Sequence, residues 1–154
     1  DTDAPFTRAK GDLIVVGAGP SFLRVQLPIG ATGQFLRPQG DLPTWEAIPF
    51  GIVGTLLSPT AAINVIMWRV LFSCTVTAIR GYRVGGTGAT INARRNGTLD
   101  HLATALSLTA TDTWMVNTAV QNTAYGAGDK LEIMIVTLTG TPAQVAIQVD
   151  FTRP

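Results

Sequence analysis

The alternation of apolar and polar positions is most regular near the C-terminal end of the chain. Over residues 144–151, every second position is a large apolar residue, namely Val145, Ile147, Val149 and Phe151. Successive side chains of a strand point to opposite faces, so this period of two predicts a strand with one buried face. Four other stretches rich in strand-forming residues predict further strands, over residues 76–84, 89–95, 113–121 and 130–137.

Residues 63–71 differ from these stretches because they form an almost continuous apolar run. Such a run predicts a strand that is covered on both faces. The dipeptide Asn96-Gly97 follows the strand predicted over 89–95, and Asn-Gly favours the tight turns of β-hairpins. We therefore expect a hairpin at this point.

Residues 99–106 carry two conflicting signals. Leu99, Leu102, Ala103 and Leu106 have the spacing of one face of a helix. Threonines on both sides of the segment favour extended structure instead. A short helix and a strand or irregular crossing both remain open.

The chain divides into two parts by composition. Residues 1–57 are rich in glycine and proline and predict an extended arm or small β subdomain, with short strands near residues 12–16, 22–27, 34–37 and 44–49. Residues 58–154 contain about seven or eight predicted strands at the spacing of an antiparallel sandwich. We therefore predict an all-β protein in which this second part is a jelly-roll-like β-sandwich, with an immunoglobulin-like sandwich as the alternative.

The composition is apolar and sparsely charged. Hydrophobic residues make up 46% of the chain and charged residues 14%, with a net charge of +1. Two explanations stay open, namely a subunit that buries much of its surface in an assembly and a threonine-rich β protein. The charge gives no footprint for nucleic acid, and no apolar stretch reaches the roughly 18 residues needed to span a membrane. Residues 1–5 lack the features of a signal peptide, so we expect a soluble chain, made in a cytoplasm or already processed.

The segment Gly17-Ala18-Gly19-Pro20 follows an apolar strand and resembles half of a dinucleotide-binding fingerprint. The third glycine of that fingerprint is replaced by Phe22, and the residues that follow alternate like a strand rather than a helix. Asp41 lies at the distance expected for the ribose ligand, but it stands in a loop rich in proline and glycine. We therefore expect no cofactor.

Candidates for catalysis and metal binding are few. His101 is the only histidine and Cys74 the only cysteine, so a nucleophile and base would rest on these two residues and Ser107. A buried structural thiol and a packed or edge histidine are the simpler predictions, and the scattered carboxylates predict no metal site. The chain is therefore expected not to be an enzyme.

The other side chains that could carry function are aromatic and basic. Trp68 and Trp114 lie within apolar strands and are predicted to be core residues, whereas Trp45 is predicted at a boundary or interface. Four arginines are predicted to form a solvated rim around one hairpin: Arg80, Arg83, Arg94 and Arg95.

The N-terminal part resembles a module of tailed-bacteriophage structural proteins. In order, the module has Gly-Asp-Leu with aliphatic residues, a glycine-rich turn, Phe-x-Arg, a Leu-x-x-Gly turn, Gly-Gln-x-Leu and a closing tryptophan. The matching residues are 11–16, 17–20, 22–24, 27–30, 33–36 and Trp45. Residues 78–90 and 127–133 resemble the trimeric jelly-roll heads of phage fibres and capsid decorations.

The resemblance implies a virion protein made in the cytoplasm of a host bacterium. It implies a homotrimeric capsid decoration, or cement, protein that binds the major capsid protein or other virion proteins and stabilises the shell. The alternative is the receptor-binding head of a tail or head fibre, whose partner is a host-surface glycan or protein. Candidate partner-binding residues are Phe6 and Arg8 of the N-terminal leader, together with Trp45. Neither nucleic acid nor membrane insertion is expected.

Overall fold

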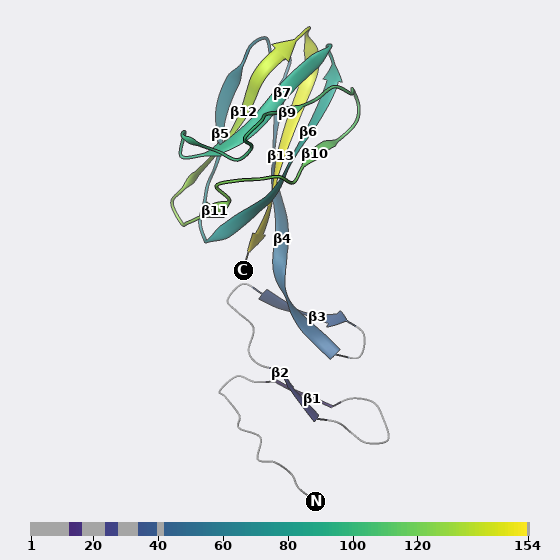
Figure 1. The fold of residues 1–154 in the computed structure, drawn as a ribbon, viewed down its shortest axis with the longest axis vertical. Helices are drawn as coiled ribbons and strands as arrows, with labels where there is room; N and C mark the ends of the chain where they lie inside the picture. The colour runs from purple at the N-terminus through teal and green to yellow at the C-terminus, as the bar shows by residue number, and fades with distance from the viewer. Residues whose placement is uncertain (1–12, 17–23, 28–33, 40–41, 154) are drawn as a thin grey trace, which may run out of the picture. The chain divides into compact units, whose positions relative to one another are not determined.

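The computed structural model describes residues 13–16, 24–27, 34–39 and 42–153, and these residues form strands, turns and loops without a helix (Figure 1). The chain divides into two compact units, Asp1–Ile48 and Pro49–Pro154. The all-β class predicted from the sequence is confirmed.

The first unit contains short antiparallel strand pairs. β1 (Leu13–Val16) pairs with β2 (Arg24–Leu27). β3 (Gln34–Gln39) pairs with the beginning of β4 (Leu42–Leu57). The strands predicted near residues 12–16, 22–27 and 34–37 are thus confirmed. The strand predicted over 44–49 is part of a 16-residue strand that continues through Gly51 and Gly54 into the second unit.

The second unit is a sandwich of two antiparallel sheets. The first sheet contains, in spatial order, β10 (Met115–Asn117), β6 (Cys74–Gly85), β13 (Pro142–Arg153) and β4, and β11 (Ala124–Tyr125) also pairs with β6. The second sheet contains, in order, β5 (Ile63–Arg69), β12 (Lys130–Thr139), β7 (Gly88–Arg95) and β8 (Leu99–Asp100), and β9 (Leu106–Ser107) also pairs with β7.

The connectivity of these strands is jelly-roll-like. From β4 to β7, each strand lies in the sheet opposite to that of the strand before it. The chain then changes sheet again before β10, before β12 and before β13. As a result the last strand, β13, lies between β4 and β6, and β12 lies between β5 and β7. This order of two interleaved antiparallel sheets is typical of jelly rolls.

The core lies between the two sheets. The alternation predicted for the last strand is confirmed, because Val145, Ile147, Val149 and Phe151 are all buried. Phe151 stacks on Phe50 of β4 with ring centroids 5.2 Å apart, and Trp68 of β5 packs edge-on against both rings. The prediction that Trp68 belongs to the core is therefore confirmed.

Two turn and crossing predictions have definite outcomes. Asn96 and Gly97 have φ angles of 54° and 77°, the left-handed backbone that a two-residue hairpin turn requires. Residues 99–106 form no helix, because β8 and β9 pair with β7 at either end of the segment. Between them, the Asn92 side chain accepts a hydrogen bond from the Leu102 N–H and donates one to the Leu102 carbonyl.

The prediction for residues 63–71 is wrong in one respect. β5 is an edge strand that pairs only with β12 among the described residues, and Ile66 is 59% exposed. A continuous apolar run indicates a strand, but it does not distinguish a strand buried in the monomer from one that leaves an apolar face exposed.

Candidate interaction surfaces

Exposed aliphatic side chains gather along β4 and β5. On β4, Phe50, Ile52 and Leu56 pack against the core, whereas Val53 and Leu57 are 53% and 76% exposed. The next strand adds Ile63 and Ile66, which are also exposed. We call Val53, Leu57, Ile63 and Ile66, with the connecting loop between β4 and β5, the uncharged corner.

The uncharged corner belongs to a long segment without charge. Residues 47–68 contain no Asp, Glu, Lys, Arg or His. On the side away from β13, β4 has no strand partner after Ala47 in the part of the chain that the structure describes. Edge strands usually carry charges, bulges or very short ladders that prevent pairing with other chains. An uncharged edge flanked by exposed aliphatic residues is instead typical of a protein contact surface.

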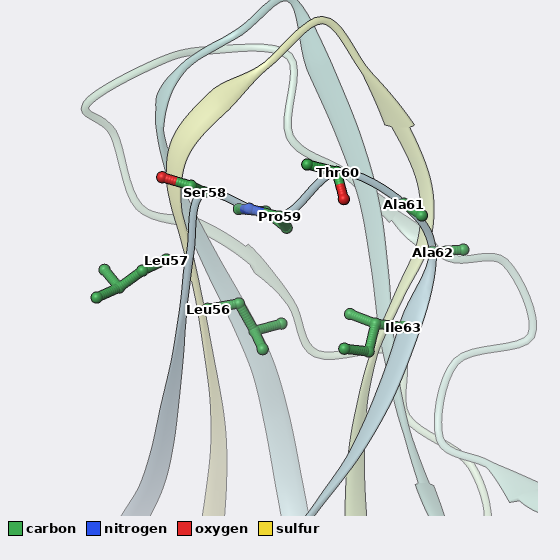
Figure 2. Close-up of a pocket in the computed structure, with 8 residues that line it drawn as sticks. All are labelled: Leu56, Leu57, Ser58, Pro59, Thr60, Ala61, Ala62 and Ile63. Atoms are coloured by element: carbon green, nitrogen blue, oxygen red, sulfur yellow. The ribbon is translucent and has the colours of Figure 1, made fainter.

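A cavity of about 310 Å³ lies within the uncharged corner and is lined by Leu56, Leu57, Ser58, Pro59, Thr60, Ala61, Ala62 and Ile63. Figure 2 shows Leu56 and Ile63 pointing toward each other across this space, with the Thr60 hydroxyl directed toward it. The lining is mixed, because aliphatic side chains such as Leu56 and Ile63 alternate with polar groups, among which the Thr60 hydroxyl is directed toward the space (Figure 2). The cavity can therefore take an apolar group that carries one hydrogen-bond donor or acceptor.

A second exposed apolar group lies at the opposite end of the first sheet. Trp114 and Val116 are each 48% exposed, and the Trp114 ring lies 5.3 Å from the ring of Tyr82. An ion pair of 2.6 Å joins Arg80 to Asp150, also in this sheet. We call Trp114, Val116 and Tyr82 the aromatic edge.

The exposure of Trp114 corrects the prediction that it is a core residue. β10 spans only three residues, and its inward-facing apolar side chain is Met115, which packs against the core. Trp114 and Val116 share a face of this strand, as predicted, but that face points away from the core. The alternating pattern identifies which residues share a face, but it does not indicate whether that face points toward the core or toward solvent.

His101 is fully buried and joins the two sheets. Its Nδ1–H donates to the Gln121 carbonyl over 3.2 Å, which leaves Nε2 to accept a hydrogen bond from the Tyr125 hydroxyl over 2.7 Å. Burial lowers the pKa of His101 and raises the pKa of Tyr125. Both ring nitrogens thus have structural partners inside the sandwich.

The predicted burial of Cys74 is confirmed, and the predicted rim of arginines requires a correction. Burial, followed by the nearby charge of Asp129, raises the pKa of Cys74 to about 11, so this thiol is a poor nucleophile. Arg83 is 2% exposed instead of solvated, because its guanidinium donates hydrogen bonds to the carbonyls of Leu108, Thr109, Gly85 and Gly86. These bonds fasten the 108–109 segment to the end of β6.

The predicted partner-binding residues are only partly within the described structure. Phe6 and Arg8 lie outside the described residues. The backbone of Trp45 pairs with that of Leu36 in the β3–β4 ladder. The uncharged corner and the aromatic edge were not predicted as sites, although the absence of charge over residues 47–68 is a signal that could have located the corner.

Other kinds of site have little basis in the described residues. No three His, Cys, Asp or Glu side chains gather there in a group that could hold a metal ion. Within the same residues, no helix has the length and apolar character needed to cross a membrane.

Comparisons with known proteins give one structural likeness to report. No protein-family model matches the chain, and no curated protein matches its sequence. Among solved structures, a chain described as "Cyanophage Pam1 capsid asymmetric unit" superposes with a TM-score of 0.49 at 12% sequence identity, over 88% of this chain and 97% of that chain.

Proposed function

We propose that this chain is a bacteriophage virion structural protein, a homotrimeric capsid decoration protein that binds and stabilises the capsid shell. The observation that carries the proposal is the pair of exposed apolar surfaces, the uncharged corner and the aromatic edge, on one β-sandwich. Surfaces of this kind mark protein contacts in soluble proteins. The proposed mechanism is binding alone, with no catalytic step and no cofactor.

Two features of the sequence support this proposal. The Gly-Asp-Leu module of residues 11–45 resembles a module of tailed-phage structural proteins, and charged residues make up only 14% of the chain. A trimer presents three N-terminal arms, so weak contacts by Phe6, Arg8 and Trp45 act together on one shell and give high avidity. The proposed partner of these arms is the major capsid protein.

The direct test is binding to capsids that lack this protein. The purified chain is expected to bind such capsids saturably and to raise the temperature at which they burst. A variant that lacks residues 1–10 is expected to keep the melting temperature of the sandwich and to lose capsid binding. Absence of the protein from purified virions, or capsids whose bursting temperature does not change, would contradict the proposal.

A receptor-binding fibre head is the second candidate function. It is favoured by the exposed ring of Trp114 beside Tyr82, because exposed aromatic rings offer an apolar face with a polar edge to a ligand such as a glycan. A fibre head is expected to bind host cells and to leave the bursting temperature of capsids unchanged. A capsid decoration protein gives the opposite pair of results.

A further inference from the structure

We propose that the Trp114 side chain of one copy inserts into the cavity of residues 56–63 of a second copy, so that copies associate head to tail. This inference rests on the proposed function in one respect, because the homotrimer is the ring that the contact closes. The pocket and the tryptophan both belong to the unit Pro49–Pro154, so the contact needs no residue of the first unit.

The chemistry of the cavity matches an indole. Leu56 and Ile63 face each other across a space of about 310 Å³ (Figure 2). The Thr60 hydroxyl oxygen, which is directed toward this space, can accept a hydrogen bond from the indole N–H (Figure 2). A buried tryptophan usually needs such an acceptor, because its ring is apolar and its N–H is polar. The cavity thus satisfies both parts of the side chain.

Trp114 is placed to act as the inserted group. Nearly half of its side-chain surface is exposed, and within its own chain its ring packs against that of Tyr82. Tryptophan and tyrosine are enriched among the residues that dominate binding energies in protein interfaces. The Arg80–Asp150 ion pair gives this sheet a polar group near the aromatic edge, and a polar rim around an apolar centre is typical of interfaces.

The absence of charge favours a copy of the same chain as the partner of the uncharged corner. A charged partner surface would lose water there without gaining an opposite charge, because residues 47–68 contain none. The aromatic edge offers Trp114 and Val116 as exposed apolar groups, and each chain carries both surfaces. Burying the aromatic edge of one copy on the uncharged corner of the next covers two exposed apolar groups of the sandwich at once.

The positions of the two surfaces let each copy contact two others. β10 and β4 are at opposite ends of the first sheet, so one contact leaves the other surface of each copy free for a further copy. Along β13, the aromatic edge lies at the level of Ala146, which pairs with Tyr82, and the cavity lies at the level of Ala143, which accepts a hydrogen bond from Ser58 N–H. Three residues correspond to roughly 10 Å along a strand. Head-to-tail contacts close into a ring where the rotation between successive copies closes, as the proposed homotrimer requires, and otherwise form an open chain.

The first experiment measures the mass of the full chain by light scattering during size-exclusion chromatography. The wild-type protein is expected at three times its chain mass of 16.3 kDa. Trp114→Ala removes the inserted group, and Thr60→Glu places a carboxylate at the cavity, so each is expected at the mass of one chain. Val136→Ala truncates an exposed valine on β12, away from both surfaces, so it is expected to remain trimeric. Thermal melting by circular dichroism checks that every variant is folded.

The second experiment mixes the two dissociated variants. The Trp114→Ala chain keeps its cavity, and the Thr60→Glu chain keeps its tryptophan. A head-to-tail contact therefore allows one pairing between them, and the mixture is expected to give a complex of two chains and nothing larger. Two chains that both carry Trp114→Ala, or both Thr60→Glu, are expected to stay apart.

The outcomes separate this inference from the proposed function. A folded Trp114→Ala variant that stays trimeric, or a mixture of the two variants that does not associate, overturns the contact while capsid binding by the wild-type chain can still hold. A wild-type chain that is monomeric at all concentrations overturns the contact and the homotrimer together. Trimers that dissociate as expected but fail to bind capsids support the contact and contradict the capsid role.

Discussion

The two lateral edges of the sandwich are built in opposite ways. At one edge, β4 and β5 are long strands with exposed aliphatic residues and no charge between Glu46 and Arg69. At the other edge, β8, β9, β10 and β11 are only two or three residues long. Short strands offer little backbone for pairing with another chain.

The short-strand edge is also closed by polar side chains. Arg83 binds carbonyls of residues 108 and 109, and His101 connects this edge of the second sheet to Gln121 and Tyr125 of the first. The Asp100 carbonyl accepts hydrogen bonds from the Gln121 and Asn122 side-chain amides. The short-strand edge thus satisfies its polar groups by internal hydrogen bonds, whereas the β4–β5 edge leaves its strands open to contact with another chain. The difference indicates that the short-strand edge depends on internal hydrogen bonds, whereas the β4–β5 edge packs one face on the core and leaves the other free for contacts.

The largest expected effect comes from removing part of β4. A chain of residues 49–154 is expected to fold, because it retains the whole second unit. A chain of residues 58–154 lacks Phe50, Ile52 and Leu56, which pack on the core, and is expected to be unfolded at room temperature. Circular dichroism and urea unfolding of the two chains test this. Equal stability of the two would show that the β4 edge is an accessory of the sandwich, and would support a domain boundary at residue 57.

Next in size is the loss of the buried guanidinium at the short-strand edge. Arg83→Met keeps most of the aliphatic volume and leaves several buried carbonyls without a donor, so it is expected to destabilise the fold by about 3 kcal/mol or more. Arg80→Met removes an ion pair whose arginine side chain is 42% exposed, and it is expected to cost about 1 kcal/mol or less. Urea unfolding curves measure both. Similar losses for the two variants would contradict the role given to Arg83.

His101 gives the short-strand edge a pH dependence. Burial lowers its folded-state pKa below the ordinary value of 6.5, so the unfolded chain binds the proton more readily. The stabilising effect is complete above pH 6.5 and decreases as the pH falls from there toward the folded-state pKa. His101→Gln is expected to cost about 1–3 kcal/mol at pH 7.5 through unsatisfied hydrogen bonds.

The same variant is expected to lose less stability than the wild type between pH 7 and pH 5. The lowered pKa of Asp129, caused by hydrogen bonds from the Gly126 backbone and the Asn96 side chain, acts only at lower pH, because its ordinary value is already 3.8. Unfolding free energies measured at several pH values provide the test. Parallel pH profiles for the wild type and the variant would exclude His101 as the source.

The smallest expected change in stability is at the β4–β5 edge. Val53→Lys places a charge on an exposed position of an open edge strand, and its effect on the unfolding free energy is expected to be within about 0.5 kcal/mol. The same change is expected to weaken self-association, because charged residues on edge strands oppose pairing and packing. Sedimentation at several concentrations measures the association. A large loss of stability with unchanged association would reverse the contrast between the two edges.

Much of the fold could be predicted from local patterns. The strand over 144–151 follows from its period of two, and the Asn96-Gly97 turn follows from the backbone angles that these residues tolerate. Antiparallel sandwich architecture follows from the number and spacing of the strands. These features depend on residues close together in the chain.

The sites could be predicted much less well. Trp114 directly precedes Met115, the first residue of β10, and the sequence does not say which of the two faces the core. Arg83 was expected in solvent because its carbonyl partners come from a segment 25 residues later. The cavity of residues 56–63 depends on how the chain turns from β4 to β5, which apolar composition does not specify.

The central place of β13 has a consequence for folding during synthesis. β4 and β6 emerge from the ribosome early, but the strand that lies between them is the last of the described strands to be made. Until then, the sides of β4 and β6 that face β13 have no strand to pair with, and the apolar partners of Phe151 lack its ring. Contacts between residues so distant in sequence form slowly and leave apolar surface exposed to solvent for longer. The nascent chain therefore spends most of its synthesis without a completed first sheet, and this is the period in which it is most exposed to aggregation.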